Sequence, residues 1–215
     1  MIVYNKFIVL EGIDGCGKGT QLKKITSYLY DLSKKNTVLV TRNPYSSPKF
    51  EAEYENIRGL LKTMKNPIEQ AQTLSNLFIE GNRFPFSKQI IEYNMSHGHF
   101  IVCDRYDLST KAYQGGLQGL DINELIQRHE GLIMPGLTFL FDIPAEVSLE
   151  RTGKSQIHSE VFDSMQLEQT EKLRQAYLSL INKLPERKII VIDAVKSPDE
   201  VFGEVKKHLN EHLKI

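Results

Sequence analysis

Short apolar runs alternate with stretches of helical character along the whole chain. The apolar runs cover residues 7–10, 37–40, 100–103, 137–141 and 188–192. Such runs, bounded by polar residues, are typical of strands buried on both faces. Leucine and isoleucine recur at helical spacing between residues 22 and 32, and Pro198 suits the first turn of a last helix. The pattern predicts an α/β protein with a five-stranded parallel sheet and helices on both faces.

Two further regions have helical character. Residues 54–93 are expected to form two helices divided near Pro67, and residues 160–184 a third long helix. No composition shift or linker interrupts the 215 residues, so we expect a single domain spanning 1–215.

Charge and cysteine content narrow the range of functions. Lys plus Arg and Asp plus Glu both number 27, so the chain has no global positive field for nucleic acid or a membrane surface. Any polyanion must therefore be bound by a local group of cations. Only two cysteines occur, Cys16 and Cys103, and no apolar run reaches the ~20 residues of a membrane helix. These features favour a cytoplasmic protein without a disulfide framework.

Polar and charged residues follow the first three predicted strands. A glycine-rich stretch follows the first, Arg42 the second, and Asp104 with Arg105 the third. Ligands of parallel α/β sheets bind beyond the carboxyl ends of the strands, so these residues are expected to form the site.

The glycine-rich stretch has the character of a phosphate-binding loop. Glycines let backbone N–H groups turn towards an anion, and a helix N-terminus and a lysine add positive charge. One departure from the Walker A pattern is that Gly19 follows Lys18, where Ser or Thr is usual, and Thr20 comes one place later. The ATP-binding residues predicted here are Gly12, Asp14, Gly15, Cys16, Gly17, Lys18, Gly19 and Thr20. Cys16 is either a reactive thiol at a helix N-terminus or a small buried residue.

Three stretches resemble the thymidylate kinases within the P-loop nucleoside-monophosphate kinases. They are FIVLEGIDGCGKGTQ at 7–21, DRYDLSTKAYQG at 104–115 and LTFLFDIPAEVSLER at 137–151. The resemblance implies the P-loop NTPase fold with a short lid at about 151–163, a homodimer, and phosphoryl transfer from ATP to dTMP. It implies that Lys18 binds the donor phosphates and that Arg42 and Arg105 bind the acceptor phosphate. Thr20 and Asp104 would organise Mg²⁺.

The same resemblance assigns the nucleoside of the acceptor. Arg83 would reach a thymine carbonyl, which a pure donor prefers over the amino group of cytosine. Asp14 would meet the sugar 3′-hydroxyl and Tyr113 would exclude a 2′-hydroxyl. Ser109, Thr110 and Gln114 would line the base pocket.

The chain departs from the family at four places. The family stacks a Phe four residues before the Arg matched by Arg83; that position is Ile79, and Phe78 is about 100° away on an α-helix. Either a local shift aligns Phe78 or the pocket differs. The predicted lid has no internal Arg, which leaves Arg151 or Lys154 as its catalytic cation. The other departures are Asn43, in place of an acidic or aromatic residue, and Gly136, in place of Asp.

Two other functions stay open on sequence grounds. The segment Gly-Lys-Gly-Thr-Gln at 17–21 also resembles adenylate kinases, which makes another nucleoside monophosphate a possible acceptor. A P-loop nucleotide-binding regulator without catalysis is the alternative from a different class. A nucleic-acid motor would need more residues and a basic surface.

Overall fold

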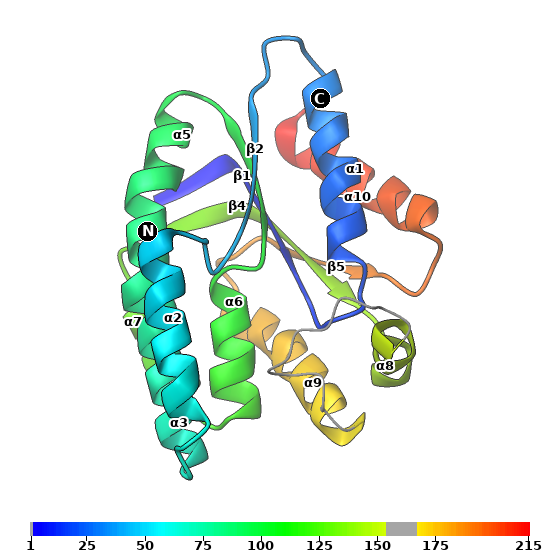
Figure 1. Ribbon diagram of the computed structural model, residues 1–215. Coiled ribbons are helices and arrows are strands. Elements are labelled where there is room, and N and C mark those ends of the chain that lie inside the picture. The colour runs from blue at the N-terminus through cyan, green and yellow to red at the C-terminus, as the bar shows by residue number, and fades with distance from the viewer. Residues whose placement is uncertain (1, 154–166) are drawn as a thin grey trace.

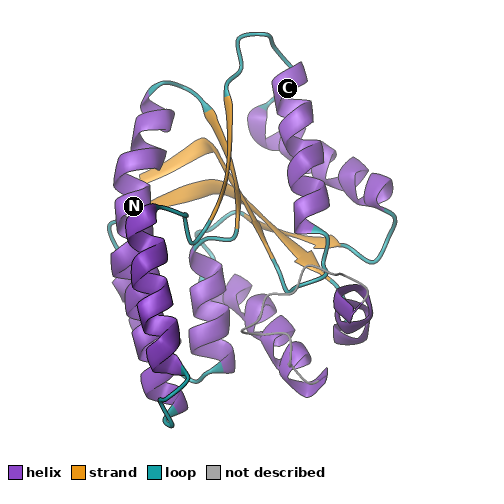
Figure 2. Cartoon of the chain, viewed as in Figure 1, coloured by secondary structure: helices purple, strands orange, loops and turns teal. Residues whose placement is uncertain are grey.

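The computed structural model describes residues 2–153 and 167–215, and this part of the chain holds one parallel sheet of five strands. The strands are β1 (Ile2–Glu11), β2 (Val38–Arg42), β3 (Phe100–Asp104), β4 (Ile133–Asp142) and β5 (Ile189–Asp193). Their order across the sheet is β2-β3-β1-β4-β5. Each predicted apolar run contributes to a strand, so the five-stranded α/β prediction is confirmed (Figure 2).

Helices cover both faces of this sheet (Figure 1). The described α-helices are α1 (Lys18–Asp31), α2 (Pro48–Leu61), α3 (Pro67–Asn76), α4 (Phe84–Phe86), α5 (Glu92–Ser96), α6 (Asp107–Thr110), α7 (Ile122–Arg128), α8 (Ala145–Gly153), α9 (Leu167–Lys183) and α10 (Pro198–Leu213). Three π-helical segments, η1 (Leu77–Arg83), η2 (Ser87–Ile91) and η3 (Lys111–Leu117), continue the α-helices beside them. None of these described helices has the length and apolar character needed to cross a bilayer.

Helices α1 and α10 lie together on one side of the sheet (Figure 1). Ile25 and Leu29 of α1 and Val205 and Leu209 of α10 are buried in the larger of two apolar clusters. The start of α10 is fixed by a capping box, in which the Ser197 side chain accepts from the Glu200 amide and the Glu200 carboxylate accepts in return. Pro198 occupies the first turn, as predicted.

The long helix from α3 to α5 covers part of the opposite face. A second apolar cluster there joins Phe86, Ile91 and Met95 to residues 7, 9, 101 and 103 of the sheet. Side chains alternate along a strand, so residues 8, 10 and 102 belong instead to the larger cluster. Burial on both faces explains why these strands are continuous apolar runs rather than alternating ones.

The predicted pair of helices over residues 54–93 agrees with the structure at its division, although the first helix, α2, begins earlier, at Pro48. Asn66 caps α3 with Pro67 at its first position, which confirms the division near Pro67. Helix α9 begins at Leu167; the predicted start near residue 160 and most of the predicted lid lie outside the described residues.

The strand pair β1 and β4 explains Gly136. Tyr4 pairs with Pro135 and Ile8 with Leu137, so β1 carries extra residues that bulge out of the ladder. A Cβ on Gly136 would lie 2.6 Å from the Asn5 Cα and from the Tyr4 carbonyl oxygen. An aspartate therefore does not fit at this position with this strand pairing.

Candidate active site

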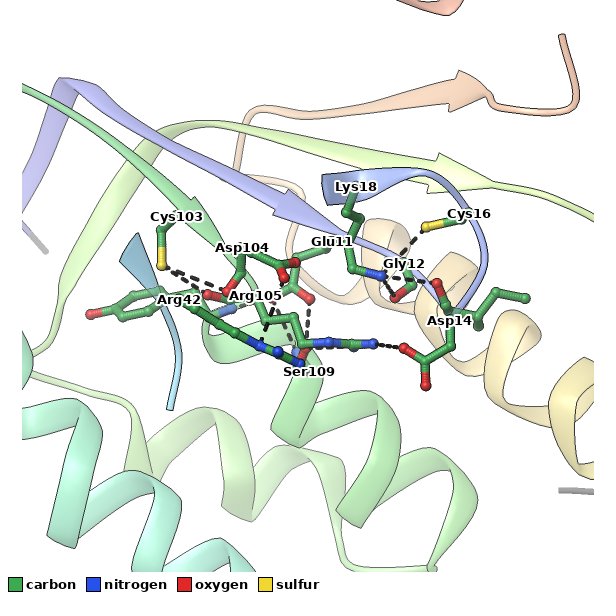
Figure 3. Close-up of polar contacts among 12 residues, drawn as sticks. Glu11, Gly12, Asp14, Cys16, Lys18, Arg42, Cys103, Asp104, Arg105 and Ser109 are labelled. Atoms are coloured by element: carbon green, nitrogen blue, oxygen red, sulfur yellow. Dashed lines mark hydrogen bonds and ion pairs between the residues drawn. The ribbon is translucent and has the colours of Figure 1, made fainter. Parts of the chain in front are cut away.

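Strand register brings the predicted site residues to one edge of the sheet. Asp104, the last residue of β3, pairs with Arg42 on one side and with Leu10 on the other. The glycine-rich loop begins two residues after Leu10 and leads into α1. The carboxyl ends of β1, β2 and β3 therefore meet at the position expected for an α/β ligand site (Figure 3).

The glycines of this loop are required by its backbone. Gly12, Gly15 and Gly17 have φ of 138°, 73° and 89°, a region that L side chains rarely adopt. A Cβ on Gly12 would lie 2.4 Å from the Phe141 carbonyl oxygen, so the loop also packs tightly on β4. Helix α8 holds it from the side, because Ser148 Oγ donates to the Asp14 carbonyl at 2.7 Å.

Lys18 begins α1 and folds over the loop. Its Nζ donates to the carbonyls of Gly12 at 3.0 Å and Ile13 at 2.9 Å (Figure 3). Cys16 is 1% exposed, and this burial favours the buried-residue interpretation of its thiol. Its Sγ lies 3.5 Å from the same Nζ. Gly19 and Thr20 are exposed on the first turn of α1.

Arg105 joins the loop to β3. Its Nη2 donates to Asp14 Oδ1 at 2.5 Å, and its Nη1 donates to Tyr177 of α9 at 3.0 Å and to Ser109 at 3.3 Å. Arg105 has φ 65°, an uncommon conformation for a residue with a side chain and one that often occurs at functional sites. Burial alone would raise the pKa of Asp14, but the charges of Arg105, Lys18 and Arg42 outweigh it and lower that pKa.

Glu11 lies at the centre of this network and was not among the predicted site residues. It is fully buried, and its carboxylate accepts from the Tyr106 amide at 2.7 Å, from Ser109 Oγ at 2.7 Å and from the Tyr177 hydroxyl at 3.3 Å. Burial raises the pKa of Glu11, against the lowering effect of Ser109, Arg105 and Tyr106. The available sequence signal was a charged residue at the end of an apolar strand, directly before the loop.

Asp104 and Arg42 face each other at the end of β2 and β3. Asp104 Oδ2 lies 3.7 Å from Arg42 Nε, and Oδ1 is buried without a hydrogen-bond partner among the described residues. The Arg42 side chain is 68% exposed and so is accessible to a ligand in solvent. A buried carboxylate oxygen without a partner is the kind of hard ligand that Mg²⁺ prefers, so the predicted magnesium site fits this residue.

Arg83 is deeply buried, at 2% exposure, on the helix that leads to α5. Its Nε donates to Asn43 Oδ1 at 3.0 Å and its Nη1 to Thr110 Oγ1 at 3.1 Å. Of the other predicted base-site residues, Tyr113 and Gln114 lie buried in η3. Tyr113 packs its ring under Arg105, with the guanidinium carbon 5.4 Å from the ring centroid. Thr110 therefore contacts Arg83 and Tyr113 contacts Arg105, whereas the Gln114 side chain donates to Gln118.

The helix around Phe78 contains the local shift that the sequence left open. Residues 77–83 form the π-helical segment η1, at whose end the Phe84 amide donates to the Ile79 carbonyl, five residues earlier. With this spacing, residues five apart follow one another on the same face, as residues four apart do in an α-helix. Phe78 is thereby aligned with Arg83 and is half-buried, whereas Ile79 is fully buried in the interior.

Arg151 lies in the last turn of α8, beside the loop rather than beside Arg105. Its Nη1 donates to the Ala194 carbonyl at 3.0 Å and approaches the Gly15 carbonyl at 3.4 Å, while Nη2 donates to the Val195 carbonyl at 3.1 Å. Lys154, the other predicted lid cation, lies outside the described residues. The cation expected from the lid stays a prediction.

The glycine loop joins a strand to a helix and carries a lysine folded over it, and an aspartate and two arginines lie at the ends of the neighbouring strands. This arrangement defines a P-loop phosphotransferase. Comparison with known proteins identifies the family within this class. A family model described as thymidylate kinase matches residues 10–205. The chain belongs to the thymidylate kinase family.

Relatives match over nearly their whole length. The thymidylate kinase of Mesoplasma florum is 34% identical over 212 residues, which is 97% of each chain. That of Syntrophus aciditrophicus is 34% identical and covers 95% of this chain and 94% of its own. The crystal structure of thymidylate kinase from Ehrlichia chaffeensis superposes with a TM-score of 0.70 at 27% identity, covering 97% of this chain and 100% of the other.

Proposed function

We propose that this protein transfers the γ-phosphoryl group of ATP to dTMP, forming dTDP and ADP. The observation that carries the proposal is the ion pair between Arg105 and Asp14, at 2.5 Å. It joins the loop suited to the donor phosphates to the strand that bears the cations suited to an acceptor phosphate. Family membership agrees with this reaction.

The proposed mechanism is positioning and charge neutralisation. The acceptor oxygen of a nucleoside monophosphate is already ionised, so the reaction needs no general base. Lys18 and the loop amides bind the donor phosphates, and Arg42 and Arg105 bind the acceptor phosphate in line with them. Arg105 is suited to a fixed position, because Asp14, Ser109 and Tyr177 all accept from its guanidinium group. Arg151 supplies a further cation from the start of the lid.

Mg²⁺ is the proposed cofactor, bound with ATP. Thr20 and Asp104 would hold it, Asp104 through its unpartnered Oδ1. When bound, the ion would neutralise charge on the donor phosphates.

Recognition of the nucleoside is proposed to involve the second group of residues. Arg83 donates to a base carbonyl, Phe78 contributes an aromatic face, and Asp14 and Tyr113 meet the deoxyribose. Ser109, Thr110 and Gln114 line the base pocket. The alignment of Phe78 with Arg83 across η1 supports this arrangement.

The test is an assay of ADP release with ATP and Mg²⁺ and a panel of acceptors. The panel contains dTMP, dUMP, dCMP, dGMP, UMP and AMP. We expect the highest kcat/KM with dTMP. Preference for another monophosphate would contradict the proposed base pocket, and ATP binding without turnover on any acceptor would support a regulatory protein instead.

On the family resemblance we also propose a homodimer formed through the helices between residues 54 and 93, and a cytoplasmic location. Sedimentation equilibrium of the purified chain tests the assembly. A monomer at all concentrations up to that of the activity assay would contradict the dimer.

A further inference from the structure

Arg83 has an unusual set of partners for a buried charge. Three side chains accept its hydrogen bonds: Asn43 Oδ1 at 3.0 Å, Thr110 Oγ1 at 3.1 Å and His129 Nε2 at 2.8 Å. They are an amide, a hydroxyl and an imidazole, so none of the three carries a compensating negative charge. The Tyr106 ring lies below the guanidinium carbon, 5.6 Å from it.

This set of partners is better suited to orientation than to charge compensation. A buried cation without a carboxylate partner costs stability, so a purely structural arginine usually has one. Here burial lowers the pKa of Arg83, and Asp107 opposes that effect at longer range. Because the guanidinium group is planar, contacts to Nε and Nη1 also set the direction of Nη2. The three acceptors therefore determine where the remaining nitrogen donates.

Asn43 is itself held in one orientation. Its Nδ2 donates to Asn82 Oδ1 at 3.1 Å, which leaves Oδ1 to face Arg83. Asn82 is in turn fixed by two contacts to the backbone of Tyr45, both 2.8 Å, one as acceptor and one as donor. The amide group of Asn43 therefore cannot rotate without breaking contacts on the other side. This residue directly follows Arg42, so a single segment connects the predicted phosphate and base contacts.

His129 is also held in one protonation state. Its Nδ1 lies 2.5 Å from the Leu125 carbonyl and must carry the proton, so Nε2 has a lone pair to accept from Arg83. Burial lowers the pKa of His129 well below its ordinary value, and the charges of Lys111 and Arg83 add to this effect. The charge of Asp107 and the hydrogen bond to the Leu125 carbonyl oppose this lowering of the pKa.

We propose that Asn43 and His129 are positioning residues that aim the free side of Arg83 at a carbonyl of the pyrimidine acceptor. They act through Arg83 and set the discrimination of that carbonyl from an amino group. The inference rests on the proposed function. It assigns to Asn43 the role of positioning Arg83. The family has an acidic or aromatic residue at this position.

The test compares matched variants of the full-length protein. His129→Gln keeps an acceptor near the position of Nε2, and His129→Leu removes it with little change in volume. Asn43→Ala removes the acceptor of Nε independently. For each variant the experiment measures KM for dTMP, KM for ATP, kcat, the ratio of kcat/KM between dTMP and dCMP, and the melting temperature. His97→Leu, at an exposed histidine before β3, is the control.

We expect His129→Leu and Asn43→Ala to raise KM for dTMP about 10-fold, as for loss of one hydrogen bond to a charged group. The preference for dTMP over dCMP should fall in parallel, with KM for ATP unchanged. His129→Gln should stay within about 3-fold of the wild type. The His97→Leu control should match the wild type.

Three outcomes would overturn the inference. The first is unchanged KM and preference in His129→Leu and Asn43→Ala. The second is an equal loss of kcat and melting temperature in His129→Gln and His129→Leu, which would make His129 structural. The third applies if His129→Leu does not fold: Asn43→Ala then decides, and a normal preference in that variant is the negative result. A wild-type protein that does not phosphorylate dTMP would contradict the proposed function instead.

Discussion

At the scale of single residues, the most informative group is the carboxylate of Glu11, which is not among the site residues predicted from the sequence. Glu11 accepts from residues of α6, of α9 and of the loop before α6: the backbone amides of Tyr106 and Ser109, the Ser109 hydroxyl and the Tyr177 hydroxyl. Ser109 and Tyr177 also accept from Arg105. Glu11 thereby fixes two of the groups that orient Arg105, whose own side-chain hydrogen bonds within residues 2–153 and 167–215 go to Asp14, Ser109 and Tyr177.

Replacing Glu11 by Gln tests this role. A Gln amide turns one acceptor into a donor that faces other donors, so at least one buried hydrogen bond is lost. We expect a loss of about 1–3 kcal/mol in the free energy of unfolding. We also expect kcat/KM for dTMP to fall by about 10-fold as Arg105 loses its support. Urea denaturation and steady-state kinetics measure the two effects.

Glu69→Gln is the matched control for this variant, because Glu69 is exposed on the first turn of α3. It should stay within about 0.5 kcal/mol of the wild type. If Glu11→Gln were as stable and active as Glu69→Gln, the network around Arg105 would not depend on this carboxylate.

At the scale of elements, the π-helical segment η1 accounts for the register of the helix that carries Arg83. A π-helical turn holds one residue more than an α-helical turn. It therefore accommodates an extra residue while the same faces of the flanking α-helical parts stay directed towards the core. Phe78 and Arg83 are separated by five residues and are aligned through this turn. The buried residues of this turn are Leu77, Ile79, Asn82 and Arg83.

Deleting Gly81 is the corresponding experiment. Gly81 is exposed within η1, and its loss should convert the turn to α-helical geometry while both flanks keep their orientation. We expect the melting temperature to fall by no more than a few degrees and KM for dTMP to stay within about 3-fold. Thermal melts and acceptor titrations measure these values.

Deletion of Gly203 is the matched control, because it removes an exposed glycine from the regular helix α10. Here the residues beyond the deletion turn by about 100°, which moves the buried positions Val205 and Leu209 out of the core. This variant should lose several kcal/mol or fail to fold. Equal damage from the two deletions would show that η1 does not act as a one-residue insertion.

At the scale of the whole molecule, a buried ion cluster joins segments far apart in sequence. Asp107 at the start of α6 contacts Lys111 Nζ at 2.6 Å and Arg187 Nη1 at 2.9 Å, and all three side chains are almost fully buried. Arg187 lies in the turn between α9 and β5. Burial opposes the charge of Asp107, but Arg187 and Lys111 hold the pKa of Asp107 well below its ordinary 3.8.

The sign of the resulting pH dependence follows from that shift. A carboxyl whose pKa is lower in the folded state contributes stability above the unfolded pKa and loses it as pH falls through the folded pKa. We expect the free energy of unfolding to decrease below pH about 3.8 in part through Asp107. Urea denaturation between pH 2 and 7 measures it.

Asp107→Asn separates this group from the other carboxylates. It leaves two buried cations without their partner, so we expect a loss of about 3–5 kcal/mol near neutral pH. Its stability should also fall less steeply in acid than that of the wild type. Parallel curves for the two proteins would place the acid sensitivity elsewhere, for example at Asp14, whose pKa is also lowered.

The sequence by itself determined the order and type of the main elements and the residues of the phosphate loop. Continuous apolar runs and glycines at fixed spacing are local patterns, and local patterns follow from steric and hydrophobic rules that need no distant partner. The same holds for the helix starts at Pro67 and Pro198. Lys18, Arg42, Asp104 and Arg105 can be predicted to lie near one another, because parallel strands all end at one edge of the sheet.

Only the tertiary structure decided which partners these residues have. The strand order places Asp104 between Arg42 and the loop, and the π-helical turn aligns Phe78 with Arg83. The acceptors of Arg83 come from residues 43, 110 and 129. Such contacts join positions dozens of residues apart, and the desolvation that makes them matter exists only once the chain has packed. For that reason the sequence predicted the phosphate-binding loop, whereas the support of Arg83 and Arg105 required the fold.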